Sequence, residues 1–162
     1  MNLLLATLAL SGSSPNLPTS IAQPVANVAS SAPAQGVVRL KSIYGFEETV
    51  ARIKADVGAK GIRFFDEIDQ TALGEGAGIK LARSTLVLFG NPPLGIQFLT
   101  SNPYAGLDWP VRMLVLQDAD GTVWIAWTDF NFIASRYRIE NRGAQLKMAS
   151  EVAASIASAA TK

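Results

Sequence analysis

The sequence predicts an α+β fold: a two-layer sandwich in which helices cover one face of a mainly antiparallel sheet of about five strands, in the order β-α-β-β-α-β-β-α. Three observations lead to this prediction. An amphipathic helical pattern spans Phe46–Lys60, two apolar runs flank an Asp-Gly turn at Asp120-Gly121, and an Ala-rich helical stretch spans Ala144–Ala160. A tight hairpin pairs its strands antiparallel, so the helices are expected to gather on one face of the sheet.

The first two elements are a strand and a helix. Apolar and polar residues alternate over Val37–Ile43, as in a strand with one buried face, and Phe46–Lys60 carries apolar residues at helical spacing. Gly45 is expected to be the N-cap, with Glu48 three residues later as in a weak capping box. Gly61 stands where a left-handed cap ends many helices, so the helix is expected to stop there.

The next segment predicts two strands joined by a loop. Ile62–Gln70 is predicted to be a strand with Phe64 and Ile68 on the same face. Leu73–Ile79 is too rich in glycine for a stable helix and is expected to be a loop. The almost wholly apolar Thr85–Phe89 is typical of a central strand that is buried on both sides.

The second half of the chain predicts a short helix, a hairpin and a long helix. Leu94–Thr100 lies between two Asn-Pro corners and is predicted to be a short helix. Pro110–Leu116 and Thr122–Trp127 are expected to pair as the hairpin. Asp129–Arg138 is predicted to be an irregular or helical connection, and the small residues of Ala144–Ala160 allow that final helix to pack closely on the sheet.

The composition argues against several classes of function. The chain has no Cys and no His, which excludes a zinc finger, a disulfide, a thiol nucleophile and a Ser-His-Asp triad. Lys and Arg number 14 against 13 Asp and Glu, a balance unlike that of a duplex-binding protein. The glycines at 74–78 and the Asp118–Gly121 turn lack the spacing of phosphate and calcium loops. We therefore expect no metal, no cofactor and no nucleic-acid partner.

Residues 1–36 differ from the rest of the chain because they contain no charged residue. Their apolar run, Leu3–Leu10, is too short to span a bilayer but fits the centre of a secretory signal, with Ala32-Pro33-Ala34 as a later A-x-A site. We expect a leader at 1–36 and a periplasmic or secreted protein; the alternative is an unstructured tail on a cytoplasmic one. Residues 37–162 are expected to form a single domain.

The two Asn-Pro corners predict a ligand groove beside the sheet. Asn91 and Asn102 begin the two corners, and Leu94 and Gly95 follow the first of them. Asn, Asp, Gly and Pro serve turns more often than binding sites, so a structural role competes with this interpretation. Two further candidates for the groove follow the second corner, Gly106 and Asp108.

Three blocks of sequence carry a family resemblance. Lys41–Thr49, Phe89–Gly95 and Asn102–Pro110 resemble, in this order, the bacterial domain-of-unknown-function 302 family, and the likeness covers about Gly36 to Arg138. The resemblance implies an α+β fold similar to half of a TATA-box-binding protein, together with homodimers. It implies no established reaction.

The resemblance also draws attention to the end of the second strand. Members of that family usually carry Ile-Asp-His there, whereas this chain has Ile68-Asp69-Gln70. Gln keeps a hydrogen-bonding group but cannot act as a general base. Asp69 and Gln70 are therefore added to the candidate groove, and no catalytic residue is assigned.

Three functions follow as hypotheses. The first is a dimeric, non-catalytic domain that binds a small or hydrophobic ligand or a protein partner in the groove, since the hairpin region is apolar and catalytic groups are few. The second is a hydrolase- or isomerase-like enzyme that uses only the carboxylates Glu67, Asp69 and Asp108. The third is a structural protein that assembles through a dimer face.

Overall fold

The sheet has five antiparallel strands, as the sequence predicts. The structure is a computed structural model that describes residues 34–162, so the predicted leader lies outside the described residues except for its last three. The strand order is β1-β5-β4-β3-β2, and every neighbouring pair is antiparallel. The strands are β1 (Val37–Lys41), β2 (Arg63–Asp69), β3 (Ser84–Gly90), β4 (Val111–Gln117) and β5 (Val123–Thr128).

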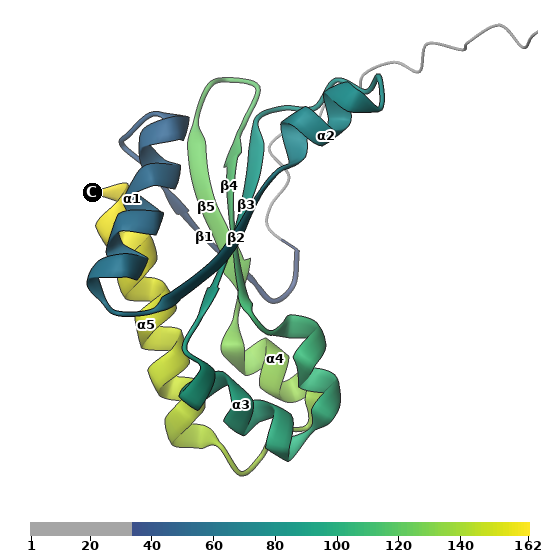
Figure 1. Ribbon diagram of the computed structural model, residues 1–162, viewed down its shortest axis with the longest axis vertical. Helices are drawn as coiled ribbons and strands as arrows, with labels where there is room; N and C mark the ends of the chain where they lie inside the picture. The colour runs from purple at the N-terminus through teal and green to yellow at the C-terminus, as the bar shows by residue number, and fades with distance from the viewer. Residues whose placement is uncertain (1–33) are drawn as a thin grey trace, which may run out of the picture.

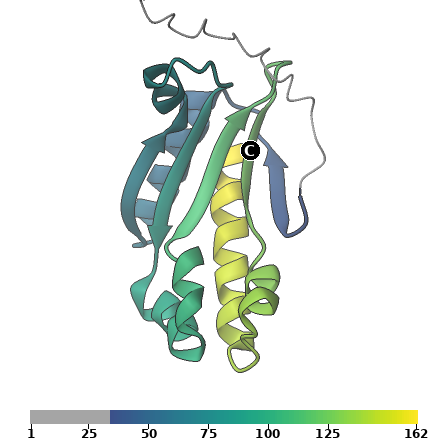
Figure 2. The same cartoon turned by 90° about the vertical axis from the view of Figure 1, so that its right-hand side faces the viewer.

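Two long helices cover one face of this sheet, and shorter helices lie at its ends (Figure 1). In Figure 2 the strands stand in front of α1 and α5, and no helix of residues 34–162 lies over the centre of the near face. The fold is thus the two-layer α+β sandwich that the sequence predicts. The helices are α1 (Phe46–Ala59), α2 (Gln70–Gly76), α3 (Pro92–Ser101), the 3₁₀ helix η1 (Pro103–Asp108), α4 (Phe130–Tyr137) and α5 (Gly143–Thr161).

The core lies between the sheet and the pair α1 and α5. Ile53 and Val57 of α1 are fully buried against β-strand residues such as Val87 and Ile125. Alanines at every third or fourth position of α5 leave room for α1 to pack alongside it. Apolar burial of this kind is the main stabilising contribution to such a fold.

The opposite face of the sheet is also apolar. Strand pairing places a patch of mostly half-buried apolar side chains there, and we call this surface the open face. The prediction that Thr85–Phe89 is buried on both sides is therefore wrong, because the described helices cover only one side. The open face consists of Ile68, Leu86, Leu88, Leu114, Leu116, Trp124 and Ala126.

Two local predictions need correction. The segment expected to be a loop starts within α2, because the Asp69 carboxylate accepts the Ala72 N–H at 3.0 Å and caps a short helix. Gly74 is needed in that helix because a Cβ there would come within 2.8 Å of Leu81. In β2 a bulge between Phe64 and Asp66 shifts the register, so Phe64 and Ile68 do not share a face.

Glycines lie at both ends of α1, just before its first residue and just after its C-cap. Gly61 has φ +64° just after α1, which confirms the left-handed position predicted there. Gly45 is the N-cap, but it has no side chain to accept a hydrogen bond, and Glu48 instead pairs with Arg52 at 3.0 Å. The capping box expected from the sequence is therefore absent from this helix start.

Candidate functional site

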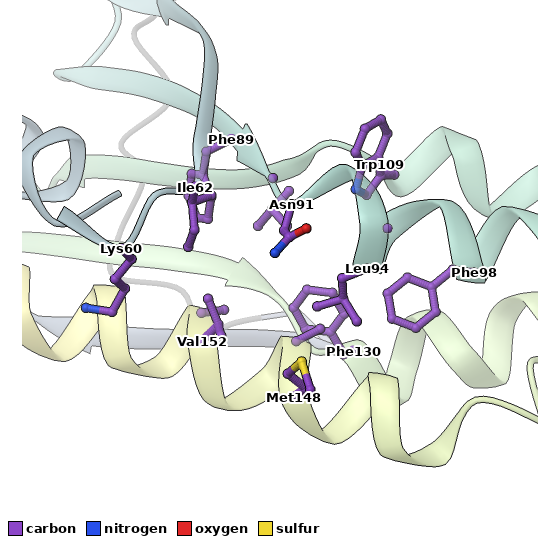
Figure 3. Close-up of a pocket in the computed structure, with 15 residues that line it drawn as sticks. Lys60, Ile62, Phe89, Asn91, Leu94, Phe98, Trp109, Phe130, Met148 and Val152 are labelled. Carbon is purple, nitrogen blue, oxygen red and sulfur yellow. The ribbon is translucent and has the colours of Figure 1, made fainter. Parts of the chain in front are cut away.

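A pocket opens where the end of β3 meets α3 and α5 (Figure 3). Its volume is about 240 Å³, which exceeds the ~150 Å³ of a cavity that holds benzene. The wall is mainly apolar and draws on β3, α3, β4, α4 and α5 and on the segment that precedes β2. The lining residues are Lys60, Ile62, Phe89, Gly90, Asn91, Leu94, Gly95, Phe98, Trp109, Val111, Phe130, Met148, Ala149, Val152 and Ala153.

Trp109 forms one side of the pocket because two glycines make space for its indole ring. A Cβ at Gly90 would lie 3.3 Å from Trp109 Nε1, and a Cβ at Gly95 would overlap the ring itself. Phe65 holds the ring from another side in an edge-to-face contact with 5.6 Å between centroids. These contacts fix the indole where α3 begins.

Two polar residues line the pocket, and they differ in how their polar groups are used. The Lys60 ammonium lies 2.5 Å from the Asp56 carboxylate, and Figure 3 shows it directed away from the cavity. The Asn91 side chain makes no capping hydrogen bond at the start of α3, and its amide points into the cavity. The pocket therefore offers an amide group among apolar side chains, an arrangement typical of small-molecule sites.

Asp108 is at the centre of a polar cluster beside the pocket, which we call the Asp108 cluster: Asp108, Arg112, Arg136 and Tyr137. Its carboxylate accepts the Tyr137 O–H at 2.6 Å and pairs with both arginines. The Asp108 side chain is only 6% exposed, so these donors replace the water it has lost. The hydrogen bond to Asp108, with burial, raises the pKa of Tyr137.

The structure divides the sequence-predicted site residues into three places. Asn91, Leu94 and Gly95 line the pocket. Asn102 caps η1 by accepting the Tyr104 N–H at 3.0 Å and donates to the Tyr137 carbonyl at 2.8 Å. Gly106 lies in η1 against Leu99, two residues before Asp108, outside the pocket wall.

The remaining two candidates lie at the opposite end of the sheet, where β2 enters α2 (Figure 1). Asp69 caps α2. Gln70 accepts the Ser84 O–H at 2.6 Å and so ties α2 to the start of β3. The two residues thus have structural partners of their own, far from Asn91 along the length of β3.

The carboxylates of the enzyme hypothesis are likewise dispersed. Glu67 pairs with Lys54 of α1 at 2.6 Å, Asp69 caps α2, and Asp108 belongs to its own cluster. Within residues 34–162 no group of three or more Asp and Glu is placed to hold a metal ion. Within the same residues no helix is long and apolar enough to cross a membrane.

Sequence reasoning missed most of the pocket wall. Phe98, Phe130, Met148 and Val152 lie on three different helices, and only the fold brings them together. Their one signal was the density of aromatic residues late in the chain, which by itself is also typical of a core. Gly90 and Gly95 make room for the Trp109 ring. Their role cannot be read from the sequence, because only the fold places Trp109 against α3.

Comparison with known proteins supports the fold and the family. The structure is similar to the crystal structure of an uncharacterized conserved DUF302 protein from Bacillus stearothermophilus, with a TM-score of 0.71 and 16% identity over 78% of this chain and 99% of that chain. The sequence is 32% identical over 104 residues to the fluoride-specific ion channels FluC 1 of Brucella suis and Brucella abortus. That match covers 64% of this chain but 41% and 38% of the two channels, so the chain spans about two fifths of their length.

A family model decides the membership. The model described as "Domain of unknown function DUF302" matches residues 38–162, which is most of the chain and nearly all of its described part. This match agrees with the resemblance carried by the three sequence blocks, and it extends that resemblance through α5. The chain belongs to the DUF302 family.

Proposed function

We propose that this domain binds a small, mainly apolar ligand in the pocket between β3, α3 and α5, without chemical conversion. The pocket carries the proposal: it has about 240 Å³ of space walled by aromatic and aliphatic side chains, with an amide directed inward. An apolar cavity of this size favours an apolar guest because binding removes apolar surface from water. The dispersal of Glu67, Asp69 and Asp108 among structural contacts supports binding rather than catalysis.

Ethylbenzene is a suitable first probe because it has the shape of a one-ring ligand and no polar group. We expect saturable binding of one ethylbenzene per chain in ligand-observed NMR. Val152→Phe should abolish the binding by filling the cavity from α5. Ala154→Phe is the matched control, because Ala154 is exposed on the same helix and does not line the pocket. Equal binding by both variants would refute the pocket as the site.

Self-association is a second candidate function, favoured by the open face. A contiguous apolar surface on a sheet commonly marks an interface. Its β1 margin carries Arg39 and Lys41, and its β2 margin carries the Asp66 carboxylate together with Arg63. A two-fold axis parallel to the strands would lay β1 of one copy over β2 of its partner, which brings the Asp66 carboxylate to the side of the two β1 cations. We therefore propose a homodimer formed through the open face.

Sedimentation velocity tests the homodimer. We expect wild-type protein to dimerise at micromolar concentration and Leu114→Glu, at the centre of the open face, to remain monomeric. Leu107→Glu is the control, since Leu107 is 67% exposed in η1, away from the open face. A wild-type monomer at every concentration would contradict this second candidate.

Export remains a proposal that rests on the sequence. The uncharged segment 1–36 with its apolar run supports a periplasmic or secreted location. The mass of the mature N-terminus, measured on protein from the native host, tests it. Cleavage between about residues 11 and 36 supports export, and an intact N-terminus recovered from the cytoplasm contradicts it.

A further inference from the structure

Two residues with side-chain N–H donors, Asn91 and Trp109, line the mainly apolar pocket. The Trp109 indole nitrogen packs over Gly90 and Gly95, and both glycines adjoin Asn91: Gly90 precedes it in the chain, and Gly95 donates its N–H to the Asn91 carbonyl at 2.9 Å. Figure 3 shows the Asn91 amide directed into the cavity and the ring nitrogen of Trp109 on the side that faces α3. A ligand atom beside the start of α3 would therefore meet an amide N–H₂ and an indole N–H.

The same end of α3 is a poor site for an anion. Pro92 and Pro93 occupy its first positions, which removes two of the backbone N–H groups that helix starts usually offer to anions. The next N–H, that of Leu94, is used by the Asn91 carbonyl at 3.1 Å. The Lys60 ammonium, at the rim, is neutralised by Asp56 at 2.5 Å. Burial of a negative charge here would therefore be uncompensated.

We propose that the ligand is a neutral molecule with a carbonyl-type oxygen beside an apolar body. The oxygen accepts hydrogen bonds from the Asn91 amide and the Trp109 N–H, and the body lies among Leu94, Phe98 and Phe130. This inference rests on the proposed binding function and names the chemistry of its ligand. The two donors give orientation and selectivity, while the apolar wall gives most of the affinity.

Three one-ring probes separate the alternatives: acetophenone has a neutral acceptor, ethylbenzene has none, and benzoate is an anion. We expect acetophenone to bind about 10-fold more tightly than ethylbenzene, as one or two net hydrogen bonds allow, and benzoate to bind most weakly. The Trp109 indole N–H signal, assigned in ¹H–¹⁵N spectra with Trp109→Phe, should shift downfield with acetophenone and much less with ethylbenzene.

Asn91→Leu supplies the matched variant. Because the Asn91 side chain does not cap α3, its replacement should leave the fold intact, and the ratio of acetophenone to ethylbenzene affinity should fall to about 1. Asn131→Leu, at an exposed position of α4, should keep the full preference.

Each failure has a distinct meaning. Equal affinities of acetophenone and ethylbenzene for wild-type protein would overturn this inference and leave the binding function standing. Benzoate binding most tightly would overturn the neutral character of the ligand. Failure of all three probes would refute the proposed binding function itself.

Discussion

Two neighbouring regions at the same end of the sheet differ in whether their polar side chains have hydrogen-bond partners. In the Asp108 cluster, the buried carboxylate takes hydrogen bonds from Tyr137 and two arginines. In the pocket, the Asn91 amide points into open space and the Lys60 ammonium turns away to Asp56. The regions share Val111 and Phe130 as a common wall. The Asp108 cluster therefore stabilises the fold, whereas the polar groups of the pocket are left available to a ligand.

A polar group lowers the stability of the fold when it is buried without a hydrogen-bond partner. A buried carboxylate without donors is strongly destabilising, so Asp108 must keep its partners for the fold to be stable. A side chain at the mouth of a pocket is hydrated when the pocket is empty and can exchange that water for a ligand. We therefore expect changes in the Asp108 cluster to lower stability, and changes to the polar groups of the pocket to alter binding.

The largest expected effect is that of Gly95→Val, which disrupts the contact between Gly95 and the Trp109 ring at the pocket wall. A Cβ at this position would overlap the Trp109 ring, so the indole must leave its place. We expect a loss of about 3 kcal/mol in the free energy of unfolding, from overpacking, and a loss of ethylbenzene binding. Urea denaturation measures the first and ligand-observed NMR the second. Gly58→Val in α1 is the control, because a Cβ at Gly58 meets nothing within 4 Å.

The next effect is that of Asp108→Asn, which keeps the shape of the side chain but removes its charge. We expect a loss of about 2 kcal/mol in the free energy of unfolding, since three donors lose a charged acceptor. The loss is limited because the side chains of Arg112 and Arg136 are 43% and 55% exposed and can turn to water. Ethylbenzene affinity should stay at the wild-type value. Lost binding at wild-type stability would reverse the comparison.

Tyr137 gives the cluster a dependence on pH. Its O–H donates to Asp108, which raises its pKa above the usual 10.0, so the folded protein holds this proton more tightly than the unfolded chain does. The resulting stabilisation is complete below about pH 10 and is lost as pH rises through the folded-state pKa. Tyr137→Phe should cost about 1 kcal/mol near neutrality and flatten the decline above pH 10. An unchanged decline in unfolding experiments at alkaline pH would contradict this assignment.

The smallest expected effect on stability is that of Asn91→Leu, within about 0.5 kcal/mol, because its side chain caps nothing. The matched change at the other end of the sheet is Asp69→Leu, which removes a cap that Ala72 uses and should cost about 1 kcal/mol. Urea denaturation of both variants measures the two losses in the free energy of unfolding. Equal losses would mean that Asn91 stabilises the fold as Asp69 does.

Local sequence signals predicted the elements whose cause is local. The hairpin of β4 and β5 forms around Asp118–Gly121 because the turn residues select it, and Asp118 further accepts the Trp124 N–H at 2.8 Å. Gly61 follows the end of α1 in the left-handed conformation, as its position in the sequence indicated. The layer arrangement followed from the same patterns, because period and turn chemistry constrain how strands can pair, whereas the family followed from the resemblance of three sequence blocks.

Features that depend on distant contacts could not be predicted in this way. The bulge after Phe64 reverses which side chains of β2 face the helices, and an alternating pattern carries no sign of it. The pocket joins Asn91 to Val152, which are separated by the whole hairpin and α4. The predicted groove was therefore right to include Asn91, Leu94 and Gly95 as neighbours of a cavity, but its wall from α5 required the three-dimensional fold.

A crystal structure of the protein under xenon pressure tests directly whether the pocket is open to an apolar guest. Xenon enters apolar cavities without needing a polar partner, so it reports the pocket independently of any ligand chemistry. We expect xenon among Leu94, Phe98 and Phe130. Crystals in which Trp109 or Met148 fills that space and excludes xenon would contradict the presence of an open ligand pocket.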